Sequence, residues 1–135
     1  FYAAHGVEPV GLEDLLRRAE VVSLHIPQTP STRGLIDARL LGLMRSDAVL
    51  VNTARGGIVD EAALKSALSG GHLAAAAFDV FAVEPPEDRE LLDLPNFIAT
   101  PHIGGSAMEA ILAMGRAAID GLEDNAVPDP ADFDL

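Results

Sequence analysis

The chain has 135 residues, a formal net charge of −12 at pH 7 and 49% hydrophobic residues, which is enough for one domain with a core. The acidic balance disfavours binding to nucleic acid by charge, and the absence of cysteine excludes disulfides, thiolate metal sites and thiol nucleophiles. Because no apolar run approaches the roughly 20 residues of a membrane span and no signal peptide is visible, we expect a cytoplasmic protein that does not associate with membranes.

Amphipathic and apolar segments alternate along the chain. In chain order they predict a helix at residues 11–19, a strand at 20–26, a helix that begins at Ser31 or Thr32 and ends at residue 43 or 44, a strand at 48–53, a helix at 60–68, a strand at 74–81, a helical turn at 89–92, a strand at 97–100 and a helix at 106–125. Residues 126–135 are expected to form an irregular, acidic tail.

This alternation of elements predicts the fold class. Fully apolar strands separated by helices indicate a parallel sheet that is covered by helices on both sides. Crossovers between parallel strands are right-handed, which favours a doubly wound sheet over a meander. A closed eight-stranded barrel would need roughly 250 residues. We therefore predict an α/β fold with an open, doubly wound parallel sheet of the Rossmann type.

Charged side chains follow the carboxyl ends of the predicted strands, where open parallel sheets bind their ligands. Arg55 follows the second strand, Asp79 and Glu84 lie at and after the end of the third, and His102 follows the fourth. The Arg55 guanidinium matches a carboxylate or a polarised carbonyl, and the proton of His102 moves near neutral pH. A Glu84 carboxylate beside His102 would raise its pKa and complete an acid/base pair. Such a set suits the reduction of a 2-oxo acid by a cofactor that delivers hydride.

Each of these residues also has a plainer interpretation when it is taken singly. Arg55 can be a solvated charge at a strand end, His102 a turn residue after a proline, and Glu84 part of an ordinary loop. Asp79 carries more weight, because a carboxylate inside an apolar run needs a partner if it is buried. His25 is interpreted as structural or as part of the rim of a cofactor site. Since the histidines are not spaced as metal ligands, we expect no metal site.

Four stretches stand in the order and spacing of one enzyme family. They are VVSLHIPQTPSTRGLID from residue 21, LVNTARGGIVDEAAL from residue 50, AAFDVFAVEPP from residue 76 and IATPHIGGS from residue 98. From about Gly11 to Leu122 the chain resembles the D-isomer-specific 2-hydroxyacid dehydrogenases, the family that includes D-3-phosphoglycerate dehydrogenase. The resemblance implies an NAD(P)-dependent oxidoreductase that interconverts a D-2-hydroxy acid and its 2-oxo acid.

The resemblance also implies roles for individual residues. Arg55 would bind the substrate and act in catalysis, His102 would be the general acid/base that also touches the substrate, and Glu84 would be the carboxylate partner of His102. The positions where the family contacts NAD fall on Ile26, Pro27, Thr53, Ala54, Arg55, Asp79, His102, Gly104 and Gly105.

The sequence departs from the family pattern in what it lacks. Neither the G-x-G-x-x-G phosphate loop nor the acidic residue that holds the adenosine ribose is present, and we expect both upstream of Phe1. We therefore interpret residues 1–122 as the second half of an NAD(P)-binding domain and residues 123–135 as a tail toward a missing substrate domain. Without the phosphate loop, the piece alone is expected to have little or no activity. The sequence leaves open the choice of NAD or NADP and the identity of the hydroxy acid.

Two further expectations concern partners. By the resemblance, the parent protein would be a homodimer that acts on a small 2-oxo or 2-hydroxy acid. The alternative, from a different class, is a dinucleotide-sensing interaction protein like the transcriptional corepressors that share this fold. Such a protein would bind its partner in a cofactor-dependent way and turn over substrate feebly, but no extended interaction tail is visible here.

Overall fold

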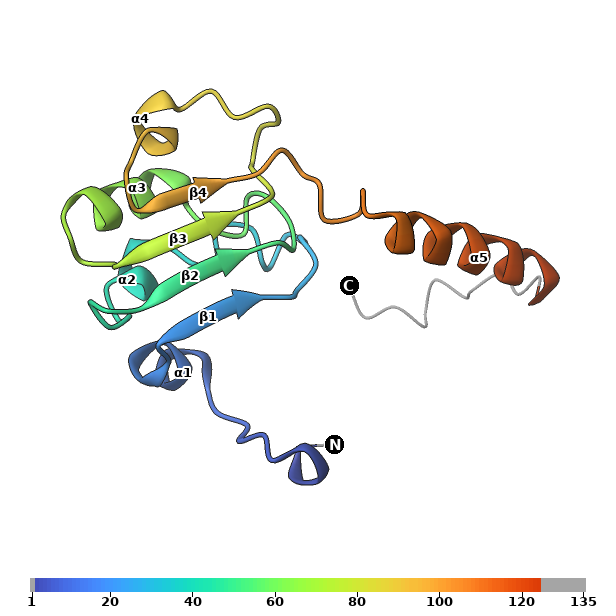
Figure 1. The fold of residues 1–135 in the computed structure, drawn as a ribbon. Coiled ribbons are helices and arrows are strands. Elements are labelled where there is room, and N and C mark those ends of the chain that lie inside the picture. The colour runs from blue at the N-terminus through green and yellow to red at the C-terminus, as the bar shows by residue number, and fades with distance from the viewer. Residues whose placement is uncertain (1, 125–135) are drawn as a thin grey trace. The chain divides into compact units, whose positions relative to one another are not determined.

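The computed structural model describes residues 2–124 and divides into two units, Phe1–Pro101 and His102–Leu135. The first unit contains the sheet with its helices, and the described part of the second contains one long helix (Figure 1). The predicted acidic tail at residues 126–135 lies outside the described residues.

The first unit is built around four parallel strands. They lie in the order β1 (Val21–Leu24), β2 (Val49–Asn52), β3 (Ala75–Phe78) and β4 (Phe97–Ala99). The register pairs Val22 with Leu50 and Leu50 with Ala76. All four predicted strands are present, although each ladder is shorter than the apolar run that predicted it. The α/β class and the parallel sheet are thus confirmed.

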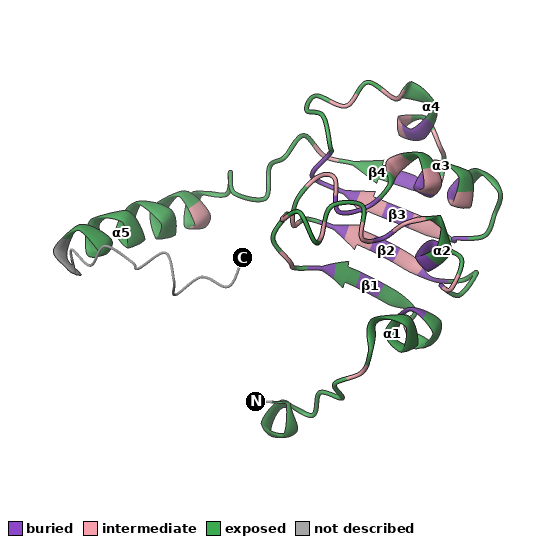
Figure 2. Ribbon diagram, turned by 180° about the vertical axis from the view of Figure 1, so that it is seen from behind, coloured by how far each residue is buried: buried purple, intermediate pink, exposed green. Residues whose placement is uncertain are grey.

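The helices of the first unit lie between and before the strands. They are the 3-10 helix η1 (Ala3–His5) and the α-helices α1 (Leu12–Arg18), α2 (Ala38–Leu41), α3 (Glu61–Ser69) and α4 (Arg89–Leu92). Figures 1 and 2 show α2 and α3 on the same face of the sheet. Successive right-handed crossovers that step in one direction place their helices on one face. The order from β1 to β4 therefore gives a single winding, which steps in one direction across the sheet.

Burial alternates along the strands and differs between the two faces (Figure 2). Val22, Leu50 and Ala76 point into the core and are at most 5% exposed. On the opposite face Val21 is 62% and Ile98 65% exposed. The prediction of a sheet covered on both sides is therefore wrong for the described part of the first unit. The reason is the single direction of winding, which places α2 and α3 on one face only.

Helix α2 begins later than the sequence predicts. Neither Ser31 nor Thr32 caps a helix, because the Thr32 hydroxyl donates to the Pro27 carbonyl oxygen at 2.7 Å inside a turn. Ile36 then pairs with Val59 in an isolated parallel bridge. Only after this bridge does the helix start, with the Asp37 side chain accepting from the Leu40 amide at 2.8 Å.

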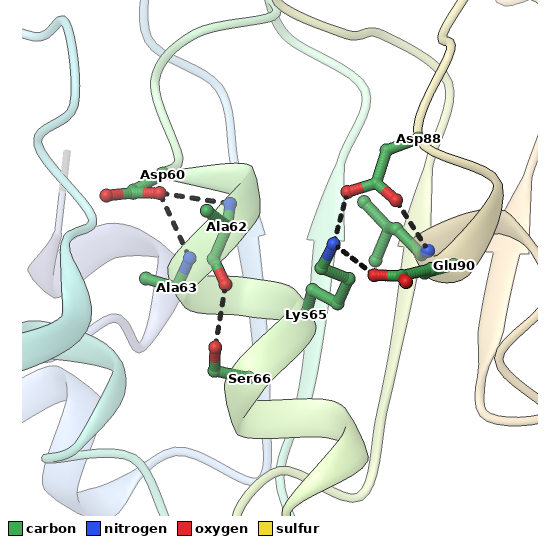
Figure 3. Close-up of polar contacts among 8 residues, drawn as sticks. Asp60, Ala62, Ala63, Lys65, Ser66, Asp88 and Glu90 are labelled. Carbon is green, nitrogen blue, oxygen red and sulfur yellow. Dashed lines mark hydrogen bonds and ion pairs between the residues drawn. The ribbon is translucent and has the colours of Figure 1, made fainter.

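Helix α3 starts directly after the loop that follows β2. The Asp60 carboxylate caps it by accepting from the amides of Ala62 and Ala63, both at 3.0 Å (Figure 3). One turn further, the Lys65 ammonium contacts Asp88 at 2.8 Å and Glu90 at 2.9 Å, the first carboxylate being the N-cap of α4. The ion pairs thereby fasten α4 to α3.

The described part of the second unit is dominated by helix α5 (Met108–Asp124), which agrees with the helix predicted at residues 106–125. His102 begins this unit with a φ of 53°, in the left-handed region. The Ser106 amide then donates to the Ile103 carbonyl oxygen at 2.9 Å, which closes a turn before the helix. Within residues 2–124, α5 and the shorter helices lack the combination of length and apolar character needed to cross a membrane.

Candidate active site

The loop after β2 is shaped by a buried asparagine. Asn52 is 1% exposed, and its side-chain amide donates to the Arg55 carbonyl oxygen at 3.0 Å. Its side-chain oxygen accepts from the Ala54 amide at 3.2 Å. The two bonds pin both ends of a short turn, so the chain leaves the sheet sharply at Thr53. The turn presents the exposed Arg55 side chain at the carboxyl end of the strand.

A hollow lies at the carboxyl ends of β1 and β2. The predicted cofactor residues of the first two strand ends share it, together with a histidine, and its lining is His25, Ile26, Pro27, Thr53, Ala54 and Arg55. Its volume is about 340 Å³. His25 lies beside β1, where its Nε2 is 2.8 Å from the Ser23 hydroxyl. The structure therefore brings together, in one open site, five of the residues predicted to contact NAD.

The carboxyl end of β3 carries a second charged residue of the predicted site, Asp79. Asp79 is 6% exposed, and Thr100 donates its hydroxyl hydrogen to the Asp79 carboxylate at 2.5 Å. The expectation that a buried Asp79 needs a partner is confirmed. Asp79 and Thr100 line a small hollow that also includes Thr53, so Thr53 borders this hollow as well as the one beside Arg55.

Glu84 lies on the segment that follows β3. Its carboxylate accepts from the Phe81 amide at 3.0 Å, and the peptide bond to Pro85 is cis. The Glu84 side chain is exposed. The start of the segment is anchored by the Phe81 ring, which is 5% exposed and packs 6.3 Å from the Phe97 ring, centroid to centroid.

The strand-end loops touch through backbone at Gly56. A Cβ built on Gly56 would lie 1.8 Å from the Phe81 carbonyl oxygen, which is far inside van der Waals contact. Only glycine therefore lets the loop that carries Arg55 lie directly against the segment that carries Glu84. This is the physical reason for the first of the two glycines after Arg55.

The remaining predicted site residues, His102, Gly104 and Gly105, belong to the second unit. In that unit they form the start of the chain segment that leads into α5, with turns at Gly104 and Gly105. The predicted meeting of His102 with Arg55 and Glu84 at one rim stays a prediction.

Three residues of the site were not singled out by the sequence. Asn52 holds the Arg55 turn, Thr100 partners Asp79, and Glu61 accepts from the Ala82 amide at 2.7 Å. For Asn52 and Thr100 a signal existed, since each is a polar residue at the end of an apolar strand run. For Glu61 there was none, because an acidic residue at a helix start is expected on helix-dipole grounds alone.

The hollow beside Arg55 suits a flat, partly polar ligand. Ile26, Pro27 and Ala54 supply apolar surface, while His25 and Thr53 supply hydrogen-bonding groups. Arg55 adds the fixed positive charge that a carboxylate needs. The site also lies where ligands of open α/β sheets bind, outside the carboxyl ends of the strands. The residues present thus fit the nicotinamide half of a dinucleotide next to an organic acid.

An open parallel sheet with a hollow at its carboxyl edge is the arrangement of Rossmann-like α/β domains, which bind their ligands there. Residues 2–104 match the family described as "D-isomer specific 2-hydroxyacid dehydrogenase, NAD binding domain", and the chain belongs to this family. The match confirms the family predicted from the sequence and supports NAD(H) as the cofactor.

The chain is similar in sequence to two dehydrogenases that act in different organisms. The chain is 50% identical over 118 residues to D-3-phosphoglycerate dehydrogenase of Mycobacterium tuberculosis, covering 87% of this chain and 22% of that protein. It is 46% identical over 117 residues to glycerate dehydrogenase of Methylorubrum extorquens, covering 84% of this chain and 37% of the relative.

A solved structure shares the fold. The holo form of D-mandelate dehydrogenase of Rhodotorula graminis superposes with a TM-score of 0.84 at 36% identity, covering 90% of this chain and 36% of that one. The chain therefore spans well under half the length of the proteins it resembles.

Proposed function

We propose that this chain is part of an NAD(P)-dependent oxidoreductase that interconverts a D-2-hydroxy acid and its 2-oxo acid. The observation that carries the proposal is the hollow at the carboxyl ends of β1 and β2, in which Arg55 stands beside a surface suited to nicotinamide. The family, whose name includes both the 2-hydroxyacid substrates and NAD binding, supports the same activity.

Arg55 is the residue that binds the acid in this proposal. Its guanidinium can donate two parallel hydrogen bonds to a carboxylate, or divide them between the carboxylate and the neighbouring carbonyl oxygen. One Arg55 amino group donates to the Ala54 carbonyl oxygen at 2.6 Å. This hydrogen bond keeps the Arg55 guanidinium near its own loop, and Asn52 fixes the loop by donating to the Arg55 carbonyl oxygen.

The family resemblance gives the acid/base roles to His102 and Glu84, and the proposal adopts these roles. During reduction, protonated His102 donates its proton to the carbonyl oxygen of the 2-oxo acid, and during oxidation neutral His102 takes the hydroxyl proton. A carboxylate on the other ring nitrogen fixes the tautomer and stabilises the imidazolium, which is the role given to Glu84. NADH, when bound, supplies the hydride.

Turnover by the full product of the gene that encodes this chain tests the proposal. The assay follows NADH or NADPH oxidation at 340 nm with a panel of 2-oxo acids. We expect Arg55→Ala to lower kcat/KM about a thousandfold, since two charge-assisted hydrogen bonds are lost. Arg33→Ala, at an exposed arginine of another loop, is the matched control and is expected to keep wild-type activity.

The assay separates this proposal from its rival. Near-normal turnover by Arg55→Ala would refute the assignment of that residue. A wild-type protein with feeble turnover on every acid, but with partner binding that depends on NADH, would favour the corepressor-like interpretation.

Three further points belong to the same proposal. The 135-residue chain alone is expected to turn over little substrate, because it contains no G-x-G-x-x-G loop to hold the pyrophosphate. The full gene product is proposed to be a cytoplasmic homodimer, which light scattering and cell fractionation test. Comparison of NADH with NADPH in the same assay decides the cofactor.

A further inference from the structure

We propose that Glu61 is a positioning residue for the reaction, which holds the segment that carries Glu84 against the loop that carries Arg55. The inference rests on the proposed function. Glu61 is the first residue of α3, so it follows the Arg55 loop closely in the chain. Its side chain reaches the segment after β3, because its carboxylate accepts from the Ala82 amide at 2.7 Å.

Two carboxylates hold consecutive peptide groups of this segment. The Phe81 amide donates to Glu84 at 3.0 Å, a bond within the segment itself. The next amide, that of Ala82, donates to Glu61, which belongs to a different element of the fold. The bond to Glu61 thus ties the segment to a different element, two residues before Glu84.

The carbonyl side of the same backbone is fixed by contact. The Phe81 carbonyl lies against Gly56, where any Cβ would collide with it. The segment therefore has the Arg55 loop on its carbonyl side and the start of α3 on its amide side. Since the Phe81 ring is buried in the core, Ala82 is the point where the chain turns outward toward Glu84. Losing the Glu61 bond frees this turn.

The surroundings of Glu61 suit a fixed role. It borders a hollow of about 200 Å³ that also contains Phe81, Val83 and Asp88. Burial, with smaller contributions from Asp88 and Asp60, raises the pKa of Glu61, while the Ala82 amide opposes the shift. Asp60 already caps α3, so the start of this helix does not need Glu61 as a cap. A half-buried carboxylate near two other acids is also electrostatically unfavourable. The hydrogen bond from the Ala82 amide is the favourable contact that Glu61 makes in this position.

Two substitutions at one position separate the hydrogen bond from the charge. Glu61→Gln removes the charge at the helix start but keeps an oxygen that accepts from Ala82, whereas Glu61→Ala removes both. In the full gene product we expect Glu61→Ala to lower kcat at least fivefold, with the KM for the cofactor unchanged within twofold, because a misplaced acid/base partner slows the chemical step. Glu61→Gln is expected to keep at least half of the wild-type kcat.

Glu90→Ala is the matched control. It removes a carboxylate that is 84% exposed and contacts Lys65, outside the proposed machinery, and is expected to keep wild-type kcat. The proposal is overturned if Glu61→Ala keeps kcat within twofold of wild type, or if Glu61→Gln is as slow as Glu61→Ala. A drop in kcat that Glu61→Gln rescues supports it.

Hydrogen exchange at the Ala82 amide keeps the inference testable apart from the proposed function. If the wild-type protein turns over no 2-oxo acid, the proposed function fails. The exchange rate of the Ala82 amide still shows whether Glu61 holds the segment that carries Glu84. Faster exchange in Glu61→Ala than in Glu61→Gln supports the hold on the segment. Equal exchange rates in the two variants would overturn it.

Discussion

Asn52→Ala probes how the fold presents the candidate active-site arginine. The side chain is 1% exposed and makes two hydrogen bonds, to the Arg55 carbonyl oxygen and from the Ala54 amide. Each such bond contributes about 1 kcal/mol net, and each buried group left unpaired costs about 1–3 kcal/mol. Because Ala54 is half-buried and Arg55 exposed, water replaces part of what is lost. We therefore expect a loss of about 2–3 kcal/mol in the free energy of unfolding.

Urea denaturation and thermal melting measure this loss. For a unit of about 100 residues, 1 kcal/mol corresponds to roughly 4 °C, so the melting temperature should fall by about 8–12 °C. The turn also loses its shape, so turnover by the remaining folded protein should fall as well. A loss below about 0.5 kcal/mol, the size of an ordinary surface effect, would refute the reasoning.

Asn96→Ala is the matched control for Asn52→Ala. The Asn96 side chain likewise makes two hydrogen bonds to the main chain, both as a donor, to the Ala74 oxygen at 3.2 Å and to the Leu68 oxygen at 3.3 Å, but at the opposite, amino end of the strands. It is expected to lower stability while leaving turnover per folded molecule unchanged. Equal loss of turnover in both variants would show that stability, and not the Arg55 turn, limits activity.

Three further changes test the loops and helix ends. Gly56→Ala places a Cβ 1.8 Å from the Phe81 carbonyl oxygen and should lower the free energy of unfolding, measured by urea denaturation, by about 3 kcal/mol or more. Gly71→Ala is the control: it lies in open space at a φ of +70° and should lower stability by only about 1–2 kcal/mol. Similar losses in the two variants would contradict the close contact at Gly56. Lys65→Met should lower the stability of the fold at low salt between about pH 5 and pH 9, because the ion pair raises the pKa of Lys65 and lowers the pKa of Asp88. The difference in stability from wild type should vanish as acid protonates Asp88. A difference that persists at pH 2 would argue against the ion pair. Asp37→Ala removes the cap of α2 and should cost about 1 kcal/mol, and no change in the melting temperature would contradict that role.

Local structure was predictable wherever short-range chemistry dominates. Apolar runs bounded by proline and glycine identified all four strands, and amphipathic spacing identified α1, α3 and α5. The start of α2 was not predictable, because Ser31 and Thr32 are good caps in isolation. A local turn, in which Thr32 donates to Pro27, and the bridge between Ile36 and Val59 override that preference, and the bridge joins segments more than 20 residues apart in the chain.

The candidate site also has a part that could be predicted from the sequence and a part that could not. Arg55 and Asp79 could be found from the sequence, since each is a charged residue at the end of an apolar strand, and the family resemblance adds their roles. That Asp79 would need a partner if buried followed from its apolar neighbours, but the identity of that partner, Thr100, did not, because strand order decides which strand end lies next to it.

The sequence by itself determined the class of fold, the family and the residue types at each strand end, because these follow from periodicity, from turn residues and from contiguous motifs. Only the tertiary structure decided which face of the sheet is covered and which loops touch. Both depend on the direction of winding and on strand order, which bring Gly56 against Phe81 and Glu61 to Ala82. Such contacts join residues far apart in the chain, and no local pattern encodes them.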